Sequence, residues 1–303
     1  MTTCLVMGGN GFIGSHITDM LVENGYNVKV FDRKMDKNNF TNKQFEFFKG
    51  DILNEDDLKR AIVDVDYIFH YIGLTIPQNS IENPLWDNEN VRASIKLFEL
   101  AKDYNVKKII FPSSGGTVYG EPETDLIAEN HPKNPINPYA ISKFSIEKYL
   151  YYFYSTYGLD YTVFRYSNPY GPRQNPHGKM GLIPVILQMI KSNKRPEIFG
   201  DGSAIRDYLY IEDACKVNLM TIQKTTKHKI FNVGSGTGYS VNEILKKVIN
   251  ITGKNISPLY TESRIGDVSR IILDISRIEN EMKWKPLIDI DSGIERTWEW
   301  LNK

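Results

Sequence analysis

Apolar residues along this chain occur either in short continuous runs or at helical spacing, and the two patterns alternate. The run over 3–7 predicts a short buried strand, and the spacing over 15–24 predicts an amphipathic helix that ends at Gly25. The apolar run over 27–31 predicts a second strand. A strand, a helix and a second strand in this order form a β-α-β unit, so the pattern predicts a parallel sheet covered by helices.

The alternation continues to the end of the chain. Further strands are predicted over 45–49, 66–71, 106–111, 161–166 and 231–234, and further helices over 83–104, 144–154, 181–191, 240–251, 278–284 and 294–301. We expect the strand over 231–234 in the small sheet of a second domain. Ser240 and Glu243 form a capping box, which predicts a helix start at that point.

A glycine-rich loop joins the first strand to the first helix. Gly8, Gly11 and Gly14 follow G-x-x-G-x-x-G spacing, and Asp32 ends the second strand. This order of strand, glycine loop, helix, strand and acid is the full context of a dinucleotide-binding fingerprint. Gly8 allows the tight turn, Gly11 lets the backbone approach a pyrophosphate, and Gly14 lets the helix pack closely. The sequence therefore predicts a cofactor whose phosphates face the helix N-terminus.

The fingerprint and the alternation together predict an α/β fold. We expect a Rossmann-like, doubly wound parallel sheet with a smaller α/β C-terminal domain that binds the substrate. A length of 303 residues allows such a pair of domains. The first domain is predicted over 1–170 and the second over 171–303, with segments around 205–235 returning to the first.

Asp32 is placed to accept hydrogen bonds from both hydroxyls of the adenosine ribose, which favours NAD over a 2′-phosphorylated cofactor. Arg33 follows it and offers a site for such a phosphate, so the alternative stays open. Asp51 and Ile52 follow the third strand and are candidates to lie beneath the adenine, although Asp51 is equally suited to a helix cap. We expect His70, at the end of the fourth strand, to be a packed structural residue.

Tyr139 and Lys143 are four residues apart and share one face of a predicted helix. An ammonium beside a phenol favours the phenolate, so the pair predicts a tyrosine base that acts near neutral pH. Taken alone, such a pair also occurs by chance on solvated helices. About 25 residues earlier, S-S-G-G-T-V-Y-G over 113–120 places hydroxyls at a strand end. We favour Ser114 as the hydroxyl that acts with Tyr139.

Composition adds few constraints. Lys plus Arg and Asp plus Glu both number 37, so the formal net charge is zero and no nucleic acid or membrane partner is indicated. The N-terminus lacks the pattern of a signal peptide. The two cysteines, Cys4 and Cys215, are too few for a disulfide framework or a metal cluster, which is typical of a cytoplasmic protein. We expect no metal.

The motifs together resemble those of the extended short-chain dehydrogenases, and within them the NAD-dependent sugar-nucleotide epimerases. The resemblance includes the glycine loop, the acid at Asp32, G-D-I over 50–52, the hydroxyl loop and the Tyr139–Lys143 pair, and it covers essentially the whole chain. It implies bound NAD. The cofactor residues we assign are Gly8, Gly11, Phe12, Ile13, Asp32, Arg33, Asp51, Ile52, Tyr71, Asn90, Ser113, Tyr139 and Lys143.

The second half of the chain matches further stretches of the family. These are N-P-Y-G-P-R-Q over 168–174, F-G-D-G over 199–202 with R-D-Y over 206–208, and R-I-G-D over 264–267. The resemblance implies that they bind a nucleotide diphosphate, with arginines on the phosphates and Asp267 on the ribose. The substrate residues it implies are Thr75, Ser114, Tyr139, Asn168, Leu182, Arg206, Arg264 and Asp267.

The resemblance implies inversion at C4 of a UDP-hexose through a 4-keto intermediate. Dehydratases of the family carry an acid just before V-Y-G, and this chain has none there, which favours epimerisation. A reductase or dehydratase of the family, or an NAD-binding module without activity, remains an alternative. The hydroxyl loop is one residue longer than the common form, so Thr117 and Ser113 remain alternatives to Ser114. Ile271 does not distinguish an N-acetylated sugar from a plain one. The resemblance also implies a homodimer through helices over 90–104 and 145–157.

Overall fold

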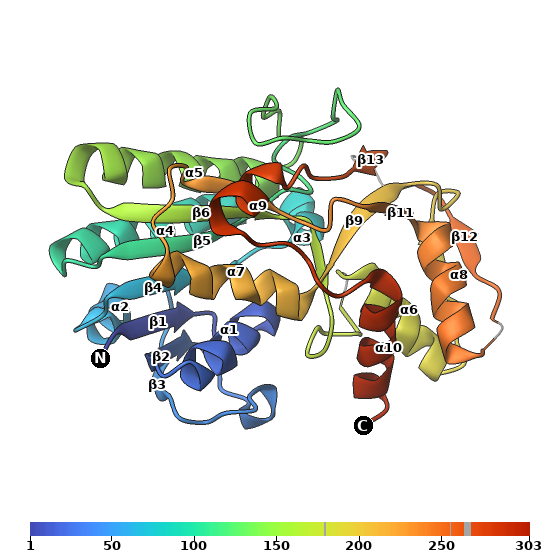
Figure 1. The fold of residues 1–303 in the computed structure, drawn as a ribbon, viewed down its shortest axis with the longest axis horizontal. Helices are drawn as coiled ribbons and strands as arrows, with labels where there is room; N and C mark the ends of the chain where they lie inside the picture. The colour runs from blue at the N-terminus through green and yellow to red at the C-terminus, as the bar shows by residue number, and fades with distance from the viewer. Residues whose placement is uncertain (179, 255, 264–267) are drawn as a thin grey trace. The chain divides into compact units, whose positions relative to one another are not determined.

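We describe the protein from a computed structural model, which places residues 1–178, 180–254, 256–263 and 268–303 (Figure 1). The chain divides into two compact units. The first comprises Met1–Ser114, Pro135–Arg165 and Cys215–Phe231, and the second comprises Gly115–Asn134, Tyr166–Ala214 and Asn232–Lys303. The chain thus leaves and re-enters each unit, with 115–134 in the second and 215–231 in the first.

A seven-stranded parallel sheet organises the N-terminal half, in the order β10-β6-β5-β4-β1-β2-β3. Its strands are β1 (Thr3–Met7), β2 (Asn27–Asp32), β3 (Glu46–Lys49), β4 (Tyr67–His70), β5 (Lys108–Ser114), β6 (Asp160–Tyr166) and β10 (Ile230–Val233). The strand order reverses between β1 and β4, which pair in parallel. In a doubly wound sheet, the carboxyl ends of the strands at this reversal form the ligand-binding crevice. The predicted Rossmann-like fold is confirmed.

Helices cover the sheet in the order expected of β-α-β units (Figure 1). They are α1 (Phe12–Glu23), α2 (Glu55–Ile62), α3 (Pro77–Glu82), α4 (Leu85–Asp103), α5 (Pro138–Tyr157) and α7 (Ile211–Gln223), with a 3-10 turn η1 (Lys37–Asn39). Asn54 begins α2 by accepting hydrogen bonds from the N–H groups of Asp56 and Asp57. Asn137 begins α5 by accepting from the N–H of Ala140. Gly158, in the left-handed conformation, ends α5.

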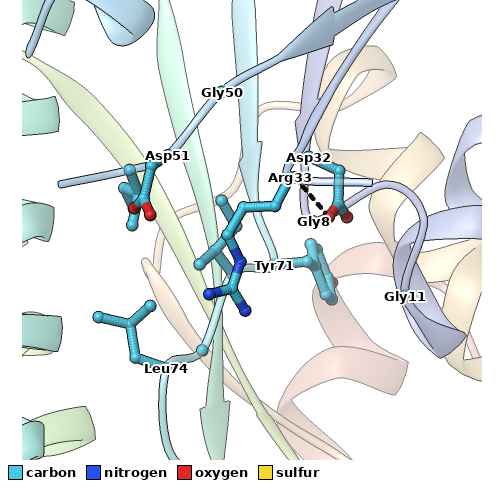
Figure 2. Close-up of a pocket in the computed structure, with 11 residues that line it drawn as sticks. Gly8, Gly11, Asp32, Arg33, Gly50, Asp51, Tyr71 and Leu74 are labelled. Atoms are coloured by element: carbon cyan, nitrogen blue, oxygen red, sulfur yellow. Dashed lines mark hydrogen bonds between the residues drawn. The ribbon is translucent and has the colours of Figure 1, made fainter. Parts of the chain in front are cut away.

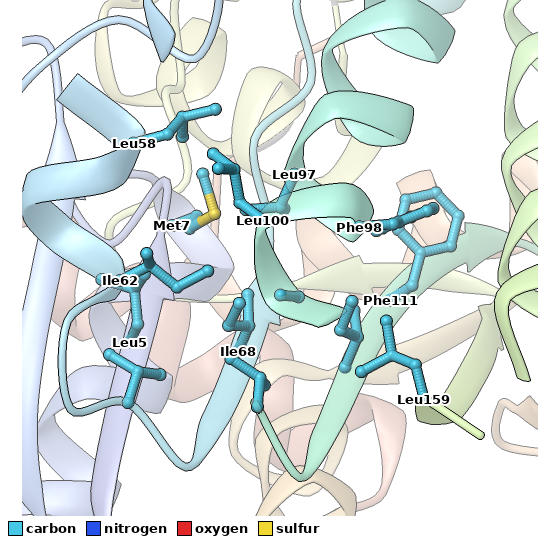
Figure 3. Close-up of a cluster of buried hydrophobic side chains, with 14 of the residues drawn as sticks. Leu5, Met7, Leu58, Ile62, Ile68, Leu97, Phe98, Leu100, Phe111 and Leu159 are labelled. Atoms are coloured by element: carbon cyan, nitrogen blue, oxygen red, sulfur yellow. The ribbon is translucent and has the colours of Figure 1, made fainter. Parts of the chain in front are cut away.

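One continuous apolar cluster joins α2, α4 and α5 to the sheet (Figure 3). Leu5 and Met7 point to this side of β1, as the period of two in a strand requires. Leu97 and Phe98 of α4 belong to the same cluster and are fully buried. Burying a side chain of this size contributes roughly 1.5–3 kcal/mol, so this cluster is a main source of stability for the unit.

The second unit contains smaller sheets. In one, β9 (Ile205–Tyr210) lies between β11 (Gly238–Ser240) and β13 (Arg270–Ile271), and β7 (Asn168–Tyr170) also pairs with β9; β8 (Glu197–Phe199) pairs with β12 (Leu259–Thr261). Its helices are α6 (Leu182–Lys191), α8 (Val241–Thr252), α9 (Ser276–Met282) and α10 (Ile290–Leu301). The predicted capping box of Ser240 and Glu243 begins α8. No helix in the described ranges combines the length and apolarity needed to cross a membrane.

One strand lies in a different sheet from the one expected. The prediction placed 231–234 in the small sheet, but β10 is an edge strand of the large sheet, beside β6. The N–H of Val163 donates to the carbonyl of Lys229, and the N–H of Ser167 donates to the carbonyl of Val233. Ile230 also packs on the main apolar cluster. A four-residue apolar run shows that a strand forms, but it does not specify the partner.

Candidate functional site

A cavity of about 180 Å³ lies at the carboxyl ends of the central strands (Figure 2). It is lined by Gly8, Gly11, Asp32, Arg33, Gly50, Asp51, Ile52, Tyr71, Ile72, Gly73 and Leu74. Seven of the residues that the sequence assigned to the cofactor are therefore gathered around one space. Phe12, Ile13, Asn90, Ser113, Tyr139 and Lys143 were assigned to the cofactor as well and are not part of this lining.

The glycine loop has the close packing that a dinucleotide phosphate site needs. Gly8 has φ of +74°, and a Cβ there would lie 2.8 Å from the carbonyl oxygen of Tyr71. A Cβ on Gly14 would lie 2.2 Å from the carbonyl oxygen of Gly8, so a larger residue would push α1 away from β1. Gly11 is the N-cap of α1 and provides no side chain to cap the first turn. The N–H groups of that turn can therefore bind an anion, and these residues fit the phosphates of NAD.

Asp32 ends β2 at one side of the cavity. One carboxylate oxygen accepts from the N–H of Arg33 at 2.8 Å (Figure 2). The other accepts from the N–H of Asn10 at 3.1 Å. Each oxygen keeps a lone pair, so the carboxylate can still accept from two ribose hydroxyls. Arg33 lies beside it at the cavity. Asp51 accepts from the N–H of Leu53 and thereby stabilises a turn. The same residue also lines the cavity, so the two roles predicted for it are compatible.

Tyr139 and Lys143 lie on the first two turns of α5 and both are half-buried. The Lys143 ammonium lies 5.7 Å from the centre of the Tyr139 ring and 4.7 Å from that of Phe111. Burial lowers the pKa of Lys143 to about 8. Burial also raises the pKa of Tyr139 to about 12, and the carboxylate of Asp87 adds to that increase. The sequence predicted that Lys143 lowers the pKa of Tyr139, whereas burial and Asp87 raise it in this structure.

The three candidate hydroxyls have different surroundings. Ser113 is buried and donates to the carboxylate of Glu147 at 2.5 Å. Ser114, the last residue of β5, is half-buried, and its hydroxyl has no hydrogen-bond partner among the described residues. The Thr117 hydroxyl is buried and likewise lacks a partner in the described part of the chain. The hydroxyl of Ser113 is therefore engaged by the fold, whereas those of Ser114 and Thr117 are available to a ligand.

Thr75 and Asn90 hold the loop that follows β4. The hydroxyl of Thr75 donates to Asp87 at 2.7 Å and accepts from the amide of Asn90 at 2.8 Å. The amide oxygen of Asn90 accepts from the N–H of Leu74 at 2.8 Å. Asn90 thus supports a residue of the cavity lining. Thr75 is buried with two protein partners, and its assignment to the sugar remains a prediction.

His70 is packed and neutral. Burial lowers its pKa to about 3, and its Nε2 lies 3.0 Å from the hydroxyl of Ser94. The rings of Phe98 and Phe111 surround it. These contacts are those of a structural residue, as the sequence predicted.

Two of the predicted substrate residues of the second unit lie on β9 or on β7, which pairs with it. The Asn168 amide donates to the carbonyl of Asp207 at 3.0 Å, and Arg206 lies between Tyr239 and Ile271 in the strand register. Leu182 begins α6 after Gly181. The carboxylate of Asp207 is fully buried and accepts from Ser235, Gly236 and Leu273. Arg264 and Asp267 fall outside the described residues.

Two buried carboxylates near Tyr139 and Lys143 were missed at the sequence level. Glu147 binds Arg165 of β6 through two hydrogen bonds of 3.0 and 2.6 Å, and both side chains are almost completely buried. Its position four residues after Lys143 on the same helix face was a usable signal. Asp87 offered no such signal, because its partners come from three other segments of the chain.

The comparison with known proteins identifies the family. The sequence profile of the NAD dependent epimerase/dehydratase family matches residues 4–234. The chain belongs to this family. The family is defined by its dependence on NAD, which agrees with the glycine cradle and with Asp32 at the cavity.

Curated relatives and solved structures match over nearly the whole length of this chain. A putative UDP-glucose 4-epimerase of Methanocaldococcus jannaschii is 42% identical, over 98% of this chain and 97% of its own. The UDP-glucose 4-epimerase of Thermotoga maritima, solved with UDP-glucose, superimposes with a TM-score of 0.95 at 37% identity, covering 99% of each chain. A UDP-N-acetylglucosamine 4-epimerase of Methanobrevibacter ruminantium, in complex with UDP-N-acetylmuramic acid, has a TM-score of 0.92 at 32% identity, covering 99% of this chain and 98% of its own.

Proposed function

We propose that this protein is an NAD-dependent UDP-sugar 4-epimerase, which inverts C4 of a UDP-hexose. The observation that carries the proposal is the combination of a dinucleotide cradle with Tyr139, Lys143 and Ser114 in one unit. The Ser114 hydroxyl has no partner within the part of the chain that the structure describes. Relatives and solved structures with this activity cover the chain end to end. The residues before Val118 in the hydroxyl loop are Gly115, Gly116 and Thr117, without an acid that elimination would use.

Gly8, Gly11 and the first turn of α1 would hold the pyrophosphate of NAD, and Asp32 would hold its adenosine ribose. The cofactor would supply an acceptor, and then a donor, for the C4 hydride. Tyr139 as phenolate takes the proton of the sugar 4-hydroxyl, directly or through Ser114, and returns it after the sugar has turned. Lys143 stabilises the phenolate by its charge, and its own orientation is held by the carbonyl of Pro112 at 2.9 Å.

The second unit carries the proposed nucleotide contacts. Asn168 and Arg206 bind the diphosphate of the substrate, together with Arg264, while Leu182 and Asp267 contact the nucleotide. A guanidinium suits this role because its planar fork donates two parallel hydrogen bonds to phosphate. The guanidinium of Arg206 donates to the carbonyl of Ile205 at 2.9 Å.

The test is incubation of the purified protein with UDP-glucose, UDP-galactose and their N-acetyl forms, without added NAD. We expect the 4-epimer of at least one of them, because the cofactor is regenerated in each cycle and stays bound. The absence of a 4-epimer from all of them, both with and without added NAD, contradicts the proposal. The same assay decides between plain and N-acetylated sugars. The sequence could not decide this from Ile271, which is fully buried and pairs with Arg206 in the sheet.

We also infer a cytoplasmic homodimer. The support is a set of half-exposed aromatic residues on α5, which are Tyr149, Tyr151, Tyr152, Tyr154 and Tyr157. Such a density of aromatic side chains is unusual for a solvated helix and typical of an interface. Light scattering at micromolar concentration tests this, and a monomer contradicts it.

A further inference from the structure

Asp87 is a buried carboxylate in the first turn of α4, with only 3% of its surface exposed. Among the described residues, three hydroxyl groups donate to it. Thr75 and Ser142 donate to one oxygen at 2.7 and 3.0 Å, and Ser80 donates to the other at 2.6 Å. The single proton of the Ser142 hydroxyl is shared with the carbonyl of Tyr139, at 2.8 Å. A negative charge is stable here because it is fully hydrogen-bonded and lies near a helix N-terminus.

These donors come from segments that carry different parts of the site. Thr75 belongs to the loop after β4 whose residues 71–74 line the cofactor cavity. Ser142 lies between Tyr139 and Lys143 on α5, so its bond to Asp87 connects the catalytic helix with that loop. Ser80 belongs to α3, so its bond to Asp87 connects that helix to the same carboxylate. One carboxylate therefore joins the cofactor cavity to the two residues of the proposed proton transfer.

We propose that Asp87 is a positioning residue for the reaction, which fixes the start of α5 relative to the cofactor loop and sets the electrostatic potential at Tyr139 and Lys143. This inference rests on the epimerase function proposed above. It assigns Asp87 no contact with substrate or cofactor, and its effect is transmitted through Ser142, Thr75 and its own charge.

The electrostatic part depends on all groups that face Lys143. Asp87 faces it from α4 and Glu147 from α5, and both carboxylates oppose the decrease that burial causes in the pKa of Lys143. From β4 it is faced by His70, which is neutral because its own pKa is about 3. From β5 it meets the uncharged ring of Phe111 and carbonyl of Pro112. Among the described residues, Asp87 and Glu147 are thus the two carboxylates that act on the ammonium, and Asp87 also raises the pKa of Tyr139.

Loss of the Asp87 charge changes the pKa of Lys143 and the pKa of Tyr139 in the same direction. Removing a negative charge disfavours the protonated ammonium and favours the phenolate, so the pKa values of Lys143 and Tyr139 both fall. Because the two groups are close, the limbs of the pH–rate profile belong to the pair. The acid and alkaline limbs should therefore move together toward lower pH when Asp87 loses its charge.

The experiment compares Asp87→Asn with the wild-type holoenzyme, because the amide keeps the shape and the serine hydroxyls can rotate to accept from it. The control is Glu89→Gln, an exposed carboxylate two residues later on α4. We expect the kcat profile of Asp87→Asn to shift by about one pH unit toward acid, with KM for the UDP-sugar unchanged, and the control to match wild type. A profile that is only scaled down, without a shift, overturns the electrostatic role.

A second variant and a second readout keep the proposal testable if Asp87→Asn folds poorly. Ser142→Ala removes the link to α5 and leaves the Asp87 charge, so turnover should fall several-fold at an unshifted pH optimum. Unchanged turnover in Ser142→Ala overturns the positioning role.

Ionisation of Tyr139 can also be followed without turnover, as the tyrosinate absorbance of each holoprotein minus that of its Tyr139→Phe derivative. Its midpoint should fall in Asp87→Asn even if wild type epimerises none of the sugars, which separates this inference from the proposed function.

Discussion

Lys143 of α5 donates to the carbonyl of Pro112 in β5 at 2.9 Å. One residue later in β5, Ser113 donates back to Glu147 of α5. The two bonds fasten the catalytic helix to the strand that ends at Ser114. Tyr139, Lys143 and Ser114 therefore belong to one rigid assembly, as pre-organisation of a proton-transfer site requires.

Tyr139→Phe should abolish the base while it leaves the fold and the cofactor cavity unchanged. We expect kcat to fall by roughly 10²–10⁴, the usual range for loss of a general base. The measurement is the epimerisation rate, with NAD content read by absorbance after denaturation. Tyr260→Phe, at an exposed position of β12, is the matched control. Activity of Tyr139→Phe close to that of Tyr260→Phe would exclude Tyr139 as the base.

Substitution of each hydroxyl identifies the one that takes part in catalysis. Ser114→Ala should lower kcat by roughly 10-fold or more at unchanged stability, because its hydroxyl has no structural partner among the described residues. Ser113→Ala should instead lower stability by about 1–3 kcal/mol, because Ser113 donates to a buried carboxylate. Thr117→Val tests the remaining alternative. If Thr117→Val loses activity and Ser114→Ala keeps it, the assignment moves to Thr117.

The buried ion pair of Glu147 and Arg165 should be needed for stability. Glu147→Gln leaves an unpaired guanidinium in the interior, and we expect a loss of about 3–5 kcal/mol in the free energy of unfolding. The measurement is urea unfolding followed by circular dichroism. Glu99→Gln breaks an exposed pair with Lys96 and should change stability by less than about 1 kcal/mol. Equal effects of the two substitutions would contradict the structural role of the buried pair.

Asp32→Ala should weaken binding of NAD by roughly 10- to 100-fold, the equivalent of one or two hydrogen bonds to a charged acceptor. Arg33 and Lys34 remain at the same place, so binding of NADP should weaken less or improve. Calorimetry on protein stripped of cofactor measures both affinities. Asp36→Asn, an exposed carboxylate nearby, is the control. A parallel loss for NAD and NADP would show that Asp32 does not select between them.

Burial lowers the pKa of Lys143 to about 8, and this decrease makes the stability of the protein depend on pH with a defined sign. The pKa of Lys143 is lower in the folded chain than its ordinary value of 10.5, so the unfolded chain binds more protons between about 8 and 10.5. Its unfavourable contribution to folding is therefore lost as pH rises through this window. Lys143→Met should flatten the stability profile there, and an unchanged profile would contradict burial of the charge.

The sequence by itself determined the order of the elements, the glycine cradle and the Tyr139–Lys143 pair. Each depends on spacing within one short segment, where the periods of strand and helix decide which side chains share a face. The gathering of Gly8, Asp32, Asp51 and Tyr71 around one cavity was likewise predictable, because the carboxyl ends of parallel strands meet at one edge.

Only the tertiary structure decided which partners these residues meet. The sequence favoured Ser114 and left Ser113 and Thr117 as alternatives, and it did not show that Ser113 donates to Glu147. It could not place β10 in the large sheet or reveal that Asp87 joins three segments. Burial also reversed the expected direction for the pKa of Tyr139. These outcomes depend on strand order and desolvation, which arise from contacts between residues far apart in the chain and leave no local pattern.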